Sequence, residues 1–192
     1  MLNPRKILVI RFSALGDLVL TTPIFRELKR VFTDAKITLL TSSGLGSVLD
    51  NNPHIDHVIR HNRNESREHL QALIQKLRKE KFELIYDAHR SLRSIWIVWN
   101  LSGIGFFSIP QVWSINKRSW SRSLLIRFKL NFLKNTLPQR LHLLHPLQNH
   151  AKIELQNHTE LFPDQSTVLR VQKFLQKTTN FRKIECMKFV IF

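Results

Sequence analysis

A short cluster of charged, hydroxyl and small residues near the N-terminus could carry chemistry. It contains a cation at Arg11, a hydroxyl at Ser13, a small residue at Gly16 and a carboxylate at Asp17. A carboxylate at the mouth of a cleft can act as a general base. In the first turn of a helix, the same carboxylate can instead cap exposed N–H groups and interact favourably with the helix dipole. Local chemistry leaves both interpretations of Asp17 open.

The segments on either side predict where this cluster lies. Ile7 to Phe12 is a short apolar run, typical of a parallel strand that is buried on both faces. From about Asp17, apolar residues recur at mostly three- and four-residue steps as far as Leu28, which indicates one helix. In open parallel sheets, ligands collect beyond the carboxyl ends of the strands. The turn between this strand and this helix is therefore a candidate ligand site.

The same alternation continues along the chain. Further strands are predicted over residues 36–42, 57–61, 82–87 and around 104–109, with helices over 66–79, 92–101, 120–133 and 145–161. Strands that alternate with helices in this way predict a parallel sheet covered on both faces. The expected fold class is thus α/β, a Rossmann-like doubly wound parallel sheet.

A second group of polar residues follows the strand predicted over 82–87. The sequence Asp87-Ala88-His89-Arg90 would lie at the same edge of the sheet as Asp17. His89 could shape a substrate pocket or assist proton movement, or it could be an ordinary polar residue at a strand end. Elsewhere, the histidines between 142 and 158 lack the spacing of metal ligands, so we expect no metal site. Gly44-Leu45-Gly46 lacks the third glycine of a dinucleotide fingerprint, and no cofactor is expected.

Charge is distributed unevenly along the chain. The formal net charge is +16, and no acidic residue occurs between Asp87 and Glu154. Such a field attracts nucleic acid, an anionic membrane or a phosphorylated glycolipid. Residues 94–116 carry no charge, but polar residues, glycine and proline interrupt them and argue against a membrane-spanning helix. A single cysteine, Cys186, fits a reducing compartment.

The stretch RFSALGDLVLTTPIFRELKRVFTDAKITLLT resembles the opening of the ADP-heptose:lipopolysaccharide heptosyltransferases, glycosyltransferase family 9. In that family a strand ends in Lys or Arg and is followed by a small hydroxyl residue, Gly-Asp and Thr-x-Pro or a similar group. The corresponding residues here are Arg11, Ser13, Gly16-Asp17 and Thr22-Pro23, and a looser similarity extends to about Pro163. The resemblance implies a GT-B enzyme, in which two Rossmann-like domains face each other across a cleft. The N-terminal domain of such an enzyme holds the lipid-linked acceptor, and the C-terminal domain holds the nucleotide-sugar donor.

The resemblance also implies a reaction and a set of site residues. The reaction is inverting, metal-independent transfer of heptose from ADP-heptose to the inner core of lipopolysaccharide, with Asp17 as the catalytic base. Arg11, Ser13, Gly16 and His89 would contribute to acceptor binding. Two arginines sit roughly where the family places acceptor-binding arginines, Arg63 and Arg122. Arg11 could equally be paired inside the fold, and Arg63 and Arg122 could be plain surface arginines.

The expected domains are an acceptor-binding domain over residues 1–163 and, over 164–192, a linker with the first strand of a donor domain. The strand is predicted at residues 187–192, without the Pro-Gly turn that follows it in the family. We therefore expect a truncated gene product or one partner of a split enzyme, inactive alone because ADP-heptose needs the missing domain. The expected partners are the lipopolysaccharide acceptor, an anionic membrane surface and a separate donor-domain chain, at the cytoplasmic face of the inner membrane. The alternative is a non-catalytic basic α/β module that binds nucleic acid or anionic membrane, although no specific nucleic-acid motif is present.

Overall fold

A five-stranded parallel sheet forms the centre of the protein. The computed structural model describes residues 3–62, 64–103, 110–115, 139–151 and 154–178. The described strands are β1 (Lys6–Ile10), β2 (Lys36–Ser42), β3 (His57–His61), β4 (Leu84–Asp87) and β5 (Gln111–Ser114), in the spatial order β3-β2-β1-β4-β5. Every described strand pair is parallel. The predicted fold class is confirmed.

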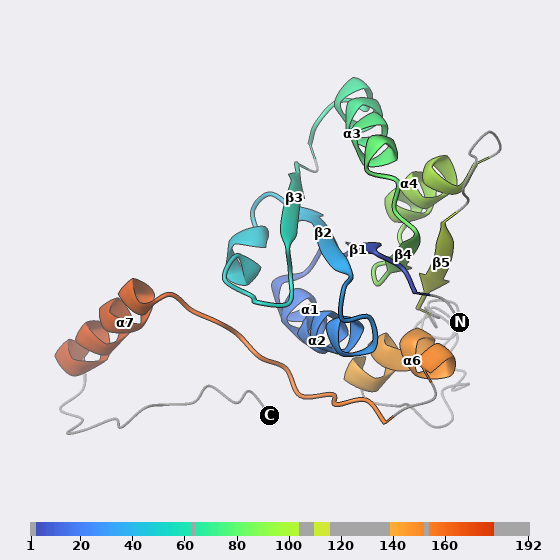
Figure 1. Ribbon diagram of the computed structural model, residues 1–192. Coiled ribbons are helices and arrows are strands. Elements are labelled where there is room, and N and C mark those ends of the chain that lie inside the picture. Colours follow the sequence, from blue (N-terminus) through green and yellow to red (C-terminus); the bar gives the residue numbers. More distant parts are fainter. Residues whose placement is uncertain (1–2, 63, 104–109, 116–138, 152–153, 179–192) are drawn as a thin grey trace, which may run out of the picture.

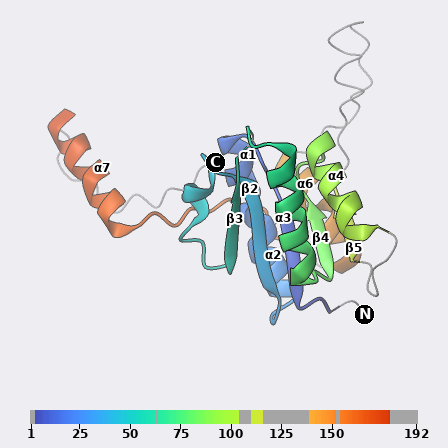
Figure 2. The same ribbon diagram turned by 90° about the horizontal axis from the view of Figure 1, so that it is seen from above.

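Helices cover both faces of this sheet (Figure 2). One face carries α1 (Leu15–Leu20), α2 (Thr22–Val31) and α6 (Gln139–Ala151), and the other carries α3 (Arg67–Glu80) and α4 (Leu92–Ser102). A 3-10 turn, η1 (Gly46–Leu49), lies between β2 and β3. The residues of β1 show why the sheet must be covered twice. Ile7 and Val9 enter one apolar cluster, whereas Leu8 and Ile10 enter the other.

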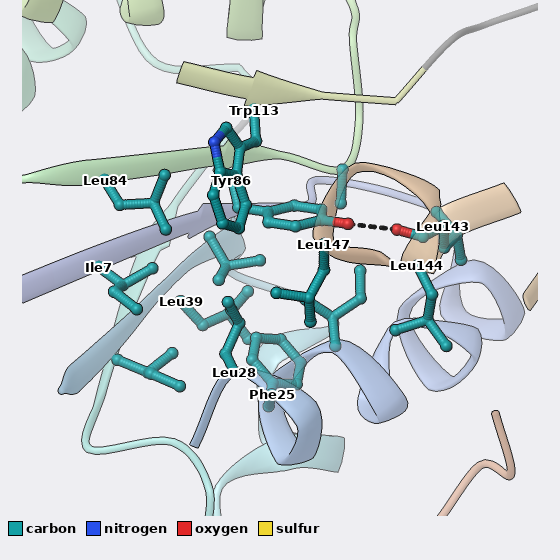
Figure 3. Packing of buried hydrophobic residues seen from close by; sticks show 14 of the residues in the cluster. Ile7, Phe25, Leu28, Leu39, Leu84, Tyr86, Trp113, Leu143, Leu144 and Leu147 are labelled. Atoms are coloured by element: carbon teal, nitrogen blue, oxygen red, sulfur yellow. Dashed lines mark hydrogen bonds between the residues drawn. The ribbon is translucent and has the colours of Figure 1, made fainter. Parts of the chain in front are cut away.

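Helix α6 is attached to the sheet by the larger of these clusters. Leu143, Leu144 and Leu147 pack with Tyr86 of β4 and Trp113 of β5 (Figure 3). The Tyr86 hydroxyl donates a hydrogen bond to the Leu143 carbonyl at 2.5 Å. Burial raises the pKa of Tyr86, so the hydroxyl keeps its proton as a donor. The start of α6 is thereby held near the carboxyl ends of the strands.

The helix predicted after the first strand is two helices in the structure. Helix α1 begins at Leu15, and Thr21 separates it from α2. Two hydroxyls accompany the break: Thr21 donates to the Leu18 carbonyl and Thr22 to the Val19 carbonyl. Pro23 lies in the first turn of α2, where its missing N–H costs no helical hydrogen bond. The prediction of one continuous helix was wrong because it followed apolar spacing through this proline.

Other boundaries agree to different degrees. Strands 36–42 and 57–61 have the predicted bounds, and α4 overlaps the predicted helix 92–101 almost completely. The strand predicted around 104–109 and the helix predicted over 120–133 lie outside the described residues, as does the strand at 187–192. The helix predicted over 145–161 is wrong at both ends, since α6 begins at Gln139 and ends at Ala151.

The segment that was predicted to continue this helix is a non-helical strap. This strap, Glu154–Leu161, runs along α2 and is held by its side chains. Arg26 donates to the carbonyls of Gln156 and His158 and pairs with the Glu160 carboxylate. The Glu160 N–H donates to the Thr22 hydroxyl at 3.0 Å. These polar contacts take the place of helical hydrogen bonds, and a local apolar pattern does not reveal them.

Beyond the strap, helix α7 (Gln165–Thr178) stands apart from the sheet (Figures 1 and 2). The linker expected over residues 164–192 stays a prediction, because a helix can also form part of a connecting segment. The domain boundary at Pro163 stays a prediction. None of the described helices is both long and apolar enough to cross a membrane.

Candidate functional site

The candidate site lies where the order of the strands changes direction. From β1 the chain moves outward to β2 and β3, then crosses back to β4 and β5 on the other side. The carboxyl ends of β1 and β4 therefore flank the switch point at which open α/β sheets bind ligands. Arg11 follows β1 and Ala88 follows β4, and the Arg11 guanidinium donates to the Ala88 carbonyl across this point.

Arg11 also forms an ion pair with Asp17, so two predicted site residues are in direct contact. Arg11 is only 5% exposed. Burial lowers the pKa of its guanidinium, and the negative charges of Asp17 and Asp87 oppose that shift. The prediction that Arg11 could be paired inside the fold is confirmed by this geometry. Its role as an acceptor ligand stays a prediction.

The ion pair with Arg11 leaves part of the Asp17 carboxylate uncovered. About a third of its side chain, 35%, remains exposed to solvent. Helix α1 begins at Leu15 with Ala14 as its N-cap and without a side-chain capping bond. The Asp17 carboxylate thus lies in the first turn of α1 and pairs with Arg11.

A cavity of about 800 Å³ opens beside Asp17. Its other lining residues come from the turn, from α1, from η1 and α6, and from the strap: Ala14, Leu15, Gly16, Val19, Leu20, Val48, Arg140, Thr159 and Leu161. A methyl group added at Gly16 would meet no atom within 4 Å, so packing does not require a glycine there. The cavity is mostly apolar with one carboxylate and one guanidinium, the composition of a pocket that orients a polar ligand.

The carboxyl end of β4 forms a hydrogen-bonded turn at the same edge of the sheet. Asp87 is buried, and its carboxylate accepts from the backbone N–H groups of His89 and Arg90 at 3.0 and 2.7 Å. The Ser94 hydroxyl donates to the same carboxylate at 2.9 Å. Arg90 adopts a positive φ of 47°, and its guanidinium donates to the Ile115 carbonyl at 2.9 Å. Asp87 therefore fixes the backbone that carries His89.

An aromatic row continues along the edge of the sheet. The Phe12 ring contacts His89 edge-on, with ring centroids 5.6 Å apart, and contacts His61 at 6.3 Å. His61 is buried and its Nδ1 lies 2.9 Å from a Glu65 carboxylate oxygen. Burial lowers the pKa of His61, while Glu65 opposes the shift. His89 thus lies at the predicted edge, packed against Phe12.

The structure brings together Arg11, Gly16 and Asp17, and Ser13 lies in the same turn. Arg63 and Arg122 lie outside the described residues. Sequence reasoning missed Arg140 and Thr159 as lining residues, because only the packing of α6 and the strap brings them to the cavity. No local motif marks either residue. Among the described residues, no group of three or more His, Cys, Asp or Glu could hold a metal ion.

Comparisons with known proteins concern the fold of the chain. No family model matches the chain. A protein of Haemophilus influenzae (strain Rd) named "Putative glycosyltransferase" is 30% identical over 105 residues, which are 55% of this chain and 30% of that protein. The solved family 9 glycosyltransferase of Veillonella parvula superposes with a TM-score of 0.69 and 16% identity, over 94% of this chain and 51% of that structure.

Two Escherichia coli enzymes are also similar. Heptosyltransferase WaaC with ADP-2-deoxy-2-fluoro heptose has a TM-score of 0.59 and 10% identity, over 79% of this chain and 50% of its own. ADP-heptose lipopolysaccharide heptosyltransferase II has a TM-score of 0.58 and 16% identity, over 88% of this chain and 50% of that structure. The chain spans about half the length of these solved structures. The protein has the α/β fold of family 9, GT-B glycosyltransferases, and the resemblance predicted from the N-terminal motif is confirmed at the level of fold.

Proposed function

We propose that residues 1–163 form the acceptor-binding half of a heptosyltransferase that acts on the inner core of lipopolysaccharide. The observation that carries the proposal is the Asp17 carboxylate, paired with Arg11 at the switch point and exposed to the cavity. Similarity to enzymes named as heptosyltransferases supports the choice of sugar.

The proposed reaction is an in-line displacement. The acceptor hydroxyl attacks the anomeric carbon of heptose while the bond to the ADP oxygen breaks, which inverts that carbon. Asp17 takes the hydroxyl proton, and ADP leaves with the bonding electron pair. Arg11 positions the carboxylate, because its buried guanidinium is fixed by the Ala88 carbonyl. No step in this scheme requires a metal.

Acceptor recognition is assigned to cations and to the turn after β1. Inner-core lipopolysaccharide carries phosphates and carboxylates, which guanidinium groups bind in bidentate fashion. Arg140 lines the cavity and is our first candidate for such a contact. Arg63, Arg122 and His89 remain further proposals, and Ser13 and Gly16 would contact the acceptor near the reacting hydroxyl.

Donor binding is assigned to a second domain outside the residues described. Stabilisation of the leaving ADP and correct placement of both substrates would depend on that domain, and such placement supplies much of the rate acceleration of enzymes. The domain could belong to a separate chain. The proposed location is the cytoplasmic face of the inner membrane, where a lipid-linked acceptor would be met at an anionic surface.

The test is ADP release from ADP-heptose with a heptose-deficient lipid acceptor. It compares the chain alone, the chain joined to a family 9 donor domain, and the joined protein carrying Asp17→Asn. We expect turnover from the joined protein only, and a loss of about 10²–10⁴-fold with Asp17→Asn, the range for a general base. Asn keeps an oxygen that can accept from Arg11, so thermal unfolding of the variant separates lost chemistry from lost structure.

A non-catalytic basic module is the second candidate, favoured by the absence of acidic residues from 88 to 153. A joined protein that folds but stays inactive would overturn the transferase proposal. Binding of unrelated polyanions that falls steeply with salt would then support the module.

A further inference from the structure

Helix α4 turns an apolar stripe toward solvent. Leu92 is 89% exposed and Trp99 is 72% exposed, and Ile95 and Trp96 lie between them, both exposed. These positions follow the i, i+3, i+4, i+7 spacing of a single helix face. The opposite side of α4 contributes Ser94, Ile97 and Leu101 to the interior. The helix is therefore apolar on its inner side and also along one outer stripe.

The neighbouring helix shows that this exposure is not imposed by the fold. Helix α3 lies beside α4 on the same face of the sheet (Figure 2) and buries Ile74 and Leu77 in the same cluster. Apart from Ala72, its exposed positions are polar or charged, including Gln71, Gln75 and Lys76. Exposed apolar side chains that gather in one patch mark an interaction surface, whereas single ones are ordinary.

Arginines lie near both ends of α4. Arg90 precedes α4 and Arg93 lies in its first turn, while Arg78 of α3 donates to the Asn100 carbonyl near its other end at 2.8 Å. Neither α4 nor the turn between Asp87 and Leu92 contains an acidic residue. Cations beside an apolar stripe attract anionic lipid headgroups, and tryptophan is enriched where a bilayer meets water.

We infer that the outer face of α4 is the surface by which this protein binds an anionic bilayer, with Trp96 and Trp99 at the headgroup level. The helix would lie in the plane of the interface, as amphipathic helices with cationic flanks do. A second copy of the chain is a poorer occupant. Two chains of net charge +16 would bring like charges together around this stripe.

This inference deepens the membrane location in the proposed function by naming the contact surface. Leu92 follows the turn after β4, so the stripe begins at the sheet edge that carries Asp17. Its test needs no transferase activity, and failure of one proposal is therefore distinguishable from failure of the other.

The test is co-sedimentation with vesicles of phosphatidylglycerol and phosphatidylethanolamine, compared with vesicles of phosphatidylcholine alone. Three proteins are compared: the unchanged chain, Leu92→Glu with Trp99→Glu, and the control Phe174→Glu. Phe174 on α7 is 66% exposed, so the control removes a similarly exposed apolar side chain elsewhere. We expect binding to the anionic vesicles only, a loss of about tenfold or more in the α4 variant, and no change in the control.

Several outcomes would overturn the inference. They are no binding by the unchanged chain, equal binding to phosphatidylcholine, equal binding by the α4 variant, or an equal loss in Phe174→Glu. A dimer in sedimentation velocity that the α4 substitutions abolish, without vesicle binding, would assign the stripe to a second copy. If circular dichroism shows that the α4 variant is unfolded, quenching of tryptophan fluorescence by brominated lipids tests the inference instead. Vesicles should quench the unchanged chain, Trp99→Phe should lose part of the quenched emission, and no quenching would reject the inference.

Discussion

The ion pair between Arg11 and Asp17 gives the carboxylate two tasks. Asp17 neutralises a guanidinium that is almost fully buried, and it presents the rest of its side chain to the cavity. Loss of the carboxylate would leave Arg11 with the Ala88 carbonyl and the more distant charge of Asp87. Stability and activity can therefore change together in Asp17 variants, which is why an isosteric amide is the informative substitution.

Arg140 offers a residue-scale prediction that does not involve this pair. Arg140→Ala should raise the KM for a phosphorylated acceptor about 10- to 100-fold with a smaller effect on kcat, since hydrogen bonds to charged groups contribute about 1.5–3 kcal/mol. Initial-rate kinetics of the joined enzyme would measure both constants. Arg170→Ala on α7 is the matched control, as its side chain is exposed and does not line the cavity. Equal effects of the two substitutions would remove Arg140 from the site.

Residues that directly follow a strand could be placed at this edge of the sheet from the sequence, whereas Arg140 and Thr159 could not. Arg11, Gly16 and Asp17 span one turn after a buried strand, so local pattern alone placed them at the correct edge. Arg140 reaches the cavity because Tyr86 and the leucines of α6 fix that helix on the sheet. That tertiary contact has no local signal, since α6 carries Pro146 and a mixed polar pattern.

At the scale of elements, segments with clear stops were predicted well, including β2, β3, α3 and α4, whereas β5 was not predicted at its position. Strand β2 is a buried apolar and β-branched run, and β3 is a short strand at the edge of the sheet; the bounds of both were correct. The helices failed where polar contacts override periodicity. Thr21 ends α1 within an unbroken apolar spacing, and Arg26 holds the strap in place of a helix.

The turn between β4 and α4 gives a prediction at this scale. The Ser94 hydroxyl donates to Asp87 and accepts from the Ser91 N–H at 2.8 Å, which completes a capping box. Ser94→Ala should lower the free energy of unfolding by about 1–3 kcal/mol, because a buried carboxylate loses one donor. Urea unfolding would measure this loss. The comparison is Ser91→Ala, which removes only the N-cap side chain and should lower the free energy of unfolding by about 1 kcal/mol. A smaller loss in Ser94→Ala than in Ser91→Ala would show that Asp87 does not depend on this hydroxyl.

At the scale of the whole molecule, long-range repulsion competes with local ion pairs. The net charge of +16 disfavours the compact state. Ion pairs such as Lys6–Glu80 and Arg60–Asp50 oppose this repulsion, but they are exposed and contribute little to the stability of the fold. Anionic ligands of either proposed kind, acceptor or lipid, would relieve the repulsion, and a ligand that binds the folded state stabilises it.

Salt should therefore stabilise this protein. Raising the ionic strength from about 0.01 M to about 0.15 M shortens the screening length from roughly 30 Å to roughly 8 Å, which removes repulsion between distant cations and leaves close buried pairs largely intact. Calorimetry in sodium chloride should show Tm rising, by about 2–4 °C for each kcal/mol gained. A falling Tm would mean that pairs such as Arg26–Glu160, which attaches the strap to α2, contribute more than the repulsion costs. Arg26→Gln separates the two effects. If screening of the Arg26–Glu160 pair lowers Tm, then Tm of the variant, which lacks this pair, should rise more steeply with salt than Tm of the unchanged protein.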